Sequence, residues 1–267
     1  MLLSDKYRVL FIHNPKAGGS AIRTALSPLA EQPSMFWHQG YLEAEDRVVD
    51  LAHLELSELP NFGVDYRNYS ILFVSRDPIE RFLSGVDEHI RQHERVIEDL
   101  NEFISREMTV GNLYYDWKYV HLRPQYRFLR VGKGVNLPAN LVVLRHSELA
   151  VAWPLVSQKL RAVRAQQECL LSEIPEWTPP QLLQIRARPD SEKRFSRETL
   201  SEASLAKLVR TYYLDYCLFG YQMPSGVLSS DGCHASNIEM IHRPYLRASV
   251  QPEALRPGEL KAYHQFS

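Results

Sequence analysis

Residues 7–26 read YRVLFIHNPKAGGSAIRTAL, and they contain the first strand and helix on which the expected fold class depends. Tyr7–His13 is an apolar run rich in β-branched residues, which predicts a buried strand. Asn14–Gly19 consists of turn-forming residues and ends that strand. Ser20 then stands where a helix N-cap is expected. The stretch therefore predicts a strand, a glycine loop and a helix in succession.

The glycine loop has the composition of an anion-binding site. Gly18 and Gly19 let the backbone approach an anion, and the next helix offers unpaired N–H groups and the positive end of its dipole. Lys16 adds a full positive charge and Ser20 a hydroxyl donor. In the loop that binds nucleoside triphosphates the lysine follows the glycines, whereas here it precedes them. The alternative is a plain glycine turn with an exposed lysine.

A second strand–turn–helix pattern begins at Tyr69. Residues 69–75 (YSILFVS) predict a strand, Asp77 suits an N-cap, and Pro78 suits the first helical position because its missing N–H is not needed there. Apolar residues then recur at helical spacing: Ile79, Phe82, Leu83, Val86 and Ile90. The same local pattern therefore occurs twice.

Arg76 stands at the carboxyl end of this second strand, which is where α/β sheets bind their ligands. Its guanidinium can bind a phosphate monoester through two parallel hydrogen bonds. Ser84 lies two turns along the predicted helix and can reach the same phosphate. We expect Arg81 on a solvated face, paired with Glu80 or Glu88.

The remaining pattern predicts an α/β fold. A third strand is expected at residues 140–144, and helices at roughly 95–107, 117–130, 147–168 and 198–217. Strands that alternate with helices favour a single domain with a central, mainly parallel sheet flanked by helices. Periodicity is lost from Met223 onward. We therefore expect one domain over residues 1–222 and an extended or partly disordered arm over 223–267.

Composition limits the partners and the compartment. The 267 residues are 45% hydrophobic and carry a net charge of −1, so no basic field points to nucleic acid or to a membrane surface. The three cysteines, Cys169, Cys217 and Cys233, lack metal-ligand spacing and predict neither zinc nor a disulfide framework. The N-terminus has no signal or transmembrane pattern. We expect a cytoplasmic protein if Met1 is the natural start, and a Golgi-lumenal one if the chain is trimmed.

Two phrases of the sequence resemble the PAPS-dependent sulfotransferase superfamily, especially its carbohydrate (Golgi-type, family 2) branch. Residues 14–21 (NPKAGGSA) are similar to the family's IPKTGGTS, and residues 76–86 (RDPIERFLSGV) to its RDPIERFLSxY. Three further phrases agree in the same order: HLRPQ with FL at 121–129, LRHSEL at 144–149 and YLDYCLFGY at 213–221. The resemblance spans about residues 7–222.

The resemblance implies a P-loop-like nucleotide-binding fold and a donor, 3′-phosphoadenosine 5′-phosphosulfate (PAPS). Its first phrase holds the 5′-phosphosulfate, which here assigns Lys16, Ala17, Gly18, Gly19, Ser20 and Ala21. Its second phrase holds the 3′-phosphate, which assigns Arg76 and Ser84. Ala17 stands where threonine is usual and Asn14 where isoleucine is common. Neither change removes a charge or a needed glycine.

Sulfuryl transfer to a hydroxyl needs a proton acceptor and stabilisation of the leaving phosphate. Lys16 suits the second role. For the base we select His53, which lies between the two phosphate motifs, where some family members place a histidine or glutamate. A histidine pKa near 6.5 permits proton uptake at neutral pH. Glu55 and Glu43 are reserves, His121 and Glu55 are candidate substrate contacts, and an ordinary polar histidine is the alternative for His53.

The expected acceptor is a carbohydrate or another small glycan, lipid or natural-product hydroxyl. We expect no metal, since a sulfuryl group carries less charge than a phosphoryl group and the sequence shows no convincing carboxylate pair for magnesium. Two other functions stay open: a P-loop-type nucleotide kinase or NTPase, and a catalytically inactive nucleotide-binding relative. A homo-oligomer formed through the C-terminal arm is a further expectation.

Overall fold

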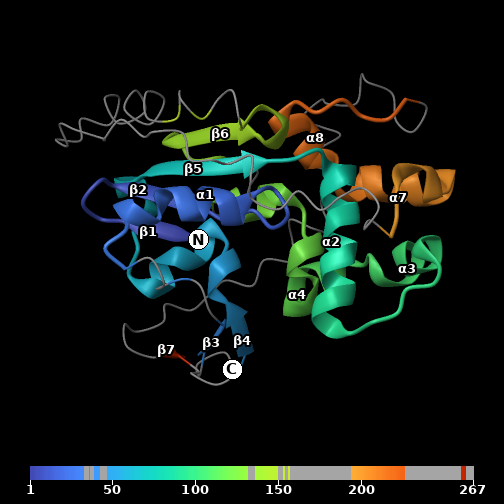
Figure 1. Ribbon diagram of the computed structural model, residues 1–267, viewed down its shortest axis with the longest axis horizontal. Coiled ribbons are helices and arrows are strands. Elements are labelled where there is room, and N and C mark those ends of the chain that lie inside the picture. Colours follow the sequence, from blue (N-terminus) through green and yellow to red (C-terminus); the bar gives the residue numbers. More distant parts are fainter. Residues whose placement is uncertain are drawn as a thin grey trace. The chain divides into compact units, whose positions relative to one another are not determined.

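The computed structural model describes residues 1–32, 36, 39–42, 47–131, 136–149, 153, 156, 194–225 and 260–262 (Figure 1). The chain divides into two compact units, each assembled from separate stretches of sequence. Unit 1 consists of Met1–Ser75, Phe128–Ala187 and Gln251–Ser267. Unit 2 consists of Arg76–Arg127 and Arg188–Val250.

A four-stranded sheet with the order β1-β2-β5-β6 forms the centre of unit 1 (Figure 1). Its strands are β1 (Leu2–Ser4), β2 (Val9–Ile12), β5 (Ser70–Ser75) and β6 (Leu141–Arg145). β1 runs antiparallel to β2, whereas β2, β5 and β6 are parallel to one another. This mainly parallel sheet with flanking helices confirms the predicted α/β class and all three predicted strands.

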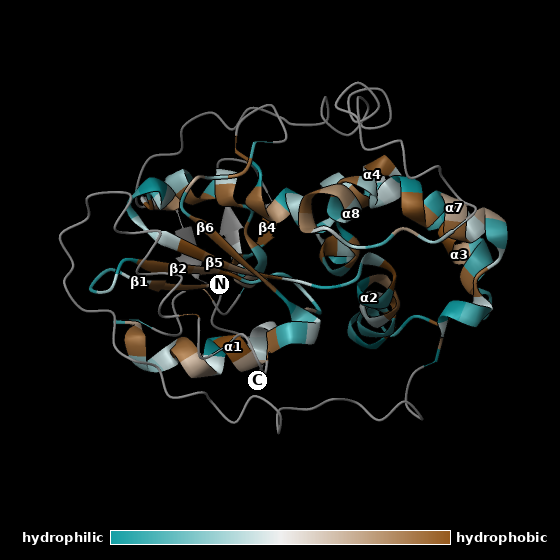
Figure 2. Cartoon of the chain, turned by 90° about the horizontal axis from the view of Figure 1, so that it is seen from above, coloured by the Kyte–Doolittle hydropathy of each residue, from teal (hydrophilic) through white to brown (hydrophobic). Residues whose placement is uncertain are grey.

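Helix α1 (Gly19–Leu26) covers one face of this sheet (Figures 1 and 2). Its buried Ile22 and Leu26 join a core with alternate strand residues: Val9, Phe11, Leu72, Val74, Val142 and Leu144. The intervening residues, such as Leu10 and Phe73, are buried as well. A parallel sheet that is covered on both faces needs such continuous apolar strands, which is why β2 and β5 are hydrophobic along their length (Figure 2).

Unit 1 also contains a small antiparallel sheet with the order β4-β3-β7. Its strands are β3 (Gln39–Leu42), β4 (Arg47–Asp50) and β7 (Leu260–Ala262). Short 3₁₀ helices connect the elements: η1 (Ser27–Leu29), η3 (Leu51–His53), η4 (Leu56–Phe62), η5 (Tyr66–Asn68) and η8 (His146–Glu148). β7 belongs to the segment predicted as an arm, most of which lies outside the described residues.

Unit 2 is helical. It contains α2 (Pro78–His93), α3 (Leu100–Glu107), α4 (Val110–Tyr115), α7 (Glu202–Thr211) and α8 (Tyr213–Phe219), with 3₁₀ helices η6 (Trp117–Leu122) and η12 (Arg197–Thr199). A further 3₁₀ helix, η7 (Gln125–Leu129), follows η6 in the chain. Asp77 caps α2 by accepting hydrogen bonds from the N–H groups of Ile79 and Glu80, both at 3.0 Å. The predicted cap and Pro78 as the first helical residue are confirmed.

Four helix predictions need correction or fall partly outside the described residues. The stretch 117–130 is two 3₁₀ helices, because Pro124 disfavours a helical backbone at the preceding Arg123, which is extended. The stretch 198–217 is broken at Tyr212, between α7 and α8. Residues 95–99 precede α3 and are not helical. Most of the helix predicted at 147–168 is not described.

Two local assignments were also wrong. Ser20 is not an N-cap, because α1 begins at Gly19 and Gly18 is its cap, with a left-handed φ of 80°. Arg81 does not lie on a solvated face, because its side chain is fully buried. The guanidinium donates hydrogen bonds to the backbone carbonyls of His121 and Arg123 instead.

Candidate functional site

The loop that joins β2 to α1 contains two residues with an unusual backbone conformation. Lys16 and Gly18 both adopt left-handed backbone conformations, with φ of 63° and 80°. A left-handed lysine is uncommon, and such residues cluster at functional loops. The Asn14 side chain donates a hydrogen bond to the Val74 carbonyl at 2.8 Å, which attaches the loop to β5 near the carboxyl end of that strand. Ala17 is fully buried, whereas Ser20 is exposed at the start of α1.

Two histidine rings pack against the glycines of this loop. A Cβ atom on Gly19 would lie 1.9 Å from Cδ2 of His13, so only glycine fits beside that ring. A Cβ on Gly18 would lie 3.3 Å from Cδ2 of His146. His146 follows the carboxyl end of β6, and sequence reasoning gave it no role. His146 follows a parallel strand, and the carboxyl ends of parallel strands are where α/β sheets bind ligands. This position in the sequence could have marked His146 as a candidate site residue.

His53 lies beside the first residue of the loop. Its Nδ1 is 3.0 Å from the backbone carbonyl of His13, and the two imidazole rings are 4.5 Å apart. A carbonyl only accepts hydrogen bonds, so Nδ1 carries the proton and Nε2 is the proton-accepting nitrogen. Nε2 lies 3.9 Å from the Asp50 carboxylate, which stabilises an imidazolium if Nε2 takes up a proton. The structure thus brings the predicted base to the predicted anion loop.

The two reserve carboxylates have different positions. Glu55 is buried and precedes η4, where its N–H donates to the Glu58 carboxylate at 2.7 Å in a capping arrangement. This gives Glu55 a structural task at the start of η4. Glu43 lies outside the described residues. The sequence analysis did not select Asp50 as a site residue. Asp50 caps η3, the 3₁₀ helix that ends at His53, so the spacing of three residues places both side chains on one helical turn.

In unit 2, Arg76 is the first residue after β5. Its side chain is 20% exposed, and Nη2 lies 3.8 Å from the Glu80 carboxylate. Burial lowers the pKa of Arg76, but the guanidinium remains charged at any physiological pH. Ser84 is partly exposed on α2, one turn beyond Glu80 and on the same helix face. Glu80, which lies 3.8 Å from Arg76, and Ser84 therefore share a face of α2.

His121 is packed inside unit 2. Its backbone carbonyl accepts from Arg81 at 3.2 Å, and a Cβ on Gly85 would lie 2.6 Å from the same oxygen. The tyrosines that precede it in the chain differ in burial. Tyr114 and Tyr119 belong to the core of unit 2, whereas Tyr115 is 59% exposed.

The predicted residues fall into two sets, one in each unit. Unit 1 holds Lys16, Ala17, Gly18, Gly19, Ser20, Ala21, His53 and Glu55, and unit 2 holds Arg76, Ser84 and His121. β2 and β5 are parallel neighbours, so the loop and the chain that leads into Arg76 both leave the sheet at its carboxyl edge.

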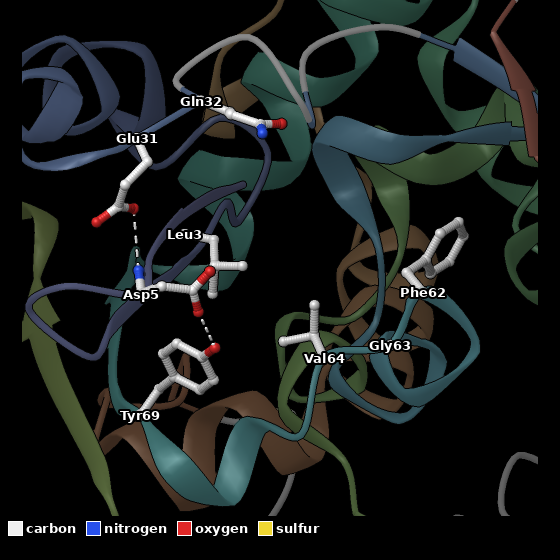
Figure 3. Close-up of a pocket in the computed structure, with 8 residues that line it drawn as sticks. All are labelled: Leu3, Asp5, Glu31, Gln32, Phe62, Gly63, Val64 and Tyr69. Carbon is white, nitrogen blue, oxygen red and sulfur yellow. Dashed lines mark hydrogen bonds between the residues drawn. The ribbon is translucent and has the colours of Figure 1, made fainter. Parts of the chain in front are cut away.

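A separate surface cavity of about 250 Å³ lies in unit 1 and is lined by none of the predicted residues (Figure 3). Two carboxylates, Asp5 and Glu31, face it together with the Tyr69 hydroxyl. Glu31 accepts from the backbone N–H of Asp5 at 3.0 Å, and Tyr69 donates to Asp5. An acidic lining disfavours a polyanionic nucleotide, so this cavity is a poor donor site.

Among the described residues, no group of three or more histidine, cysteine, aspartate or glutamate side chains is arranged to hold a metal ion. No helix in the described parts of the chain is long and apolar enough to cross a bilayer.

Comparison with known proteins gives one match. The family model described as "Sulfotransferase family" matches residues 1–222, which is most of the chain. No curated protein and no solved structure gave a significant match. The matched range ends within the described segment 194–225, just after α8.

Proposed function

Because this chain belongs to the sulfotransferase family, we propose that it transfers a sulfuryl group from PAPS to an acceptor hydroxyl. We place the acceptor among carbohydrates and other small glycans, lipids or natural products. Lys16 to Ala21 bind the 5′-phosphosulfate in this proposal, and Arg76 and Ser84 bind the 3′-phosphate. His53 is the general base.

One observation supports this proposal above the others: His53 lies beside the anion loop, with its Nδ1 3.0 Å from the His13 carbonyl. A base acts only within hydrogen-bond reach of the proton it removes, so its position counts before its pKa. Forty residues separate His13 from His53 in sequence. Their contact is therefore a product of folding and not of local spacing.

The proposed reaction is a single in-line displacement. The acceptor oxygen forms a bond to sulfur while the bond from sulfur to the bridging phosphate oxygen breaks. The hydroxyl proton passes to Nε2 of His53 and then to solvent, and the bond electrons leave with 3′-phosphoadenosine 5′-phosphate (PAP). Lys16 and the loop N–H groups stabilise the charge that develops on that phosphate.

Ligand-dependent melting tests the donor. PAP is expected to raise the melting temperature of the full chain, because a ligand that binds only the folded state stabilises it. ATP with Mg²⁺ is expected to have no comparable effect. A preference for ATP with Mg²⁺ would contradict the proposal and favour the kinase or NTPase alternative.

Turnover tests the base. With labelled PAPS and a panel of sugar, lipid and phenol acceptors, His53→Ala is expected to lower the rate by about 10²- to 10⁴-fold, the usual contribution of a general base. PAP binding, measured by the same melting shift, is expected to be unchanged. His93→Ala is the matched control, because His93 is the last residue of α2 and its Nε2 contacts the Lys118 carbonyl at 3.2 Å. Full activity in the His53 variant would remove His53 from the mechanism.

A further inference from the structure

Gln125 contacts Arg76 with both ends of its side-chain amide. Its Oε1 accepts from the Arg76 N–H at 2.9 Å, and its Nε2 donates to the Arg76 carbonyl at 2.7 Å. The N–H and the carbonyl belong to the two different peptide planes on either side of Arg76. Gln125, itself fully buried, therefore restrains the backbone on both sides of the arginine side chain.

Asp215 of α8 holds Gln125 in turn. Its Oδ2 accepts from the Gln125 N–H and its Oδ1 from the Tyr126 N–H, both at 2.8 Å. Asp215 is fully buried. A continuous chain of short hydrogen bonds thus runs from Asp215 through Gln125 to Arg76, and every residue in it belongs to unit 2.

Other buried groups fix the same segment from α2 and from the α7–α8 junction. Arg81 donates to the carbonyls of His121 and Arg123. The Tyr212 hydroxyl donates to the Leu122 carbonyl at 2.7 Å. Since residues 121–126 are attached to several helices at once, Gln125 has a rigid base from which to hold Arg76.

We infer that Gln125 is a positioning residue for donor binding, because it sets the direction in which the Arg76 side chain leaves the backbone. This inference rests on the proposed function, in which Arg76 binds the 3′-phosphate. A guanidinium binds phosphate most strongly when its two parallel N–H groups are correctly directed. A backbone held before the ligand arrives also reduces the ordering cost of binding.

The experiment compares two nucleotides that differ only in the group that Arg76 is proposed to bind: PAP and adenosine 5′-phosphate. Gln125→Met keeps the length of the side chain and removes both amide contacts. It is expected to weaken PAP binding about tenfold, or about 1.4 kcal/mol, and to leave binding of adenosine 5′-phosphate unchanged. In an Arg76→Ala background the same substitution is expected to have no further effect on PAP.

Gln92→Met is the matched control, since Gln92 is exposed on α2 and its amide donates a hydrogen bond to Glu88 at 3.0 Å. It is expected to bind both nucleotides as the wild type does. If Gln125→Met does not give a cooperative melting transition, Gln125→Asn replaces it, because the shorter amide cannot reach both groups of Arg76.

The outcomes distinguish a failure of the inference about Gln125 from a failure of the proposed function. Equal losses for both nucleotides, or a full further loss in the Arg76→Ala background, would mean that Gln125 supports the fold without acting through Arg76, and would overturn the inference alone. A wild-type protein that binds PAP and adenosine 5′-phosphate equally well would overturn the proposed function, and the inference with it.

Discussion

At the scale of single residues, the backbone of Gly19 lies directly against the imidazole of His13. This close approach sets the shape of the loop, and the His13 carbonyl at its start also orients His53. The loop and the proposed base therefore depend on the same residue. A change at Gly19 should affect both.

Gly19→Ala is expected to destabilise the protein, because the new Cβ would lie 1.9 Å from the His13 ring. Overpacking of this kind costs about 1–3 kcal/mol. The free energy of unfolding, measured by urea denaturation, checks this, and PAP binding should weaken as well. The double variant His13→Ala with Gly19→Ala should recover part of the lost stability, since the clash is then removed.

Gly111→Ala provides the control. A Cβ at Gly111 of α4 would meet nothing closer than 3.8 Å, and alanine is the better helix former. This variant is expected to be as stable as the wild type or slightly more stable. Equal stability of Gly19→Ala and the wild type would contradict the packing described for His13.

At the scale of elements, α2 connects the segment at Arg76, proposed to bind the 3′-phosphate, to the core of unit 2. Its exposed side carries Glu80, and its buried side carries Phe82, Val86 and the fully buried Arg81. The helix begins directly after Asp77, whose carboxylate accepts hydrogen bonds from two N–H groups of the first turn. The N-cap therefore lies next to Arg76 in the chain.

Asp77→Ala is expected to lower the stability of the protein by about 0.5–2 kcal/mol, the usual cost of losing an N-cap. Asp77→Asn is the paired control, because asparagine caps helices about as well as aspartate and keeps the acceptor oxygen. The melting temperatures of the two variants provide the measurement. If both lose the same stability, the charge of Asp77 matters and the cap does not.

At the scale of the whole molecule, a buried carboxyl links stability to pH. Burial raises the pKa of Asp215 from 3.8 to about 6, although the nearby Arg81 and the N–H groups of Gln125 and Tyr126 act in the opposite direction. The folded state then binds this proton more tightly than the unfolded state. The stability that Asp215 contributes is therefore present below about pH 4 and is lost as pH rises through about 6.

Comparison with Asp215→Asn isolates this contribution. The free energy of unfolding of the wild type minus that of the variant is expected to fall by on the order of 3 kcal/mol between pH 4 and pH 7. Denaturant titrations at several pH values measure it. Carboxyls with a lowered pKa, such as Glu107, give the opposite trend but cancel in the difference. A difference independent of pH would show that Asp215 titrates normally.

The sequence alone determined the parts of this protein that depend on neighbours in the chain. The apolar run before the glycine loop, the cap at Asp77 and Pro78, and the strand before Arg76 all follow from local preferences, and the structure has them as predicted. The prediction of an element failed where two local preferences in the sequence disagree. Pro124 broke an expected helix, and Gly18 replaced Ser20 as the cap of α1.

Only the tertiary structure decided which distant residues meet. Gln125 lies 49 residues from Arg76, and no periodicity predicts that its amide spans both sides of that backbone. Arg81 looked like a surface charge because its helix is amphipathic, yet it is buried where backbone carbonyls satisfy its guanidinium. Such contacts arise when packed elements bring polar groups together away from water, where each must find a partner.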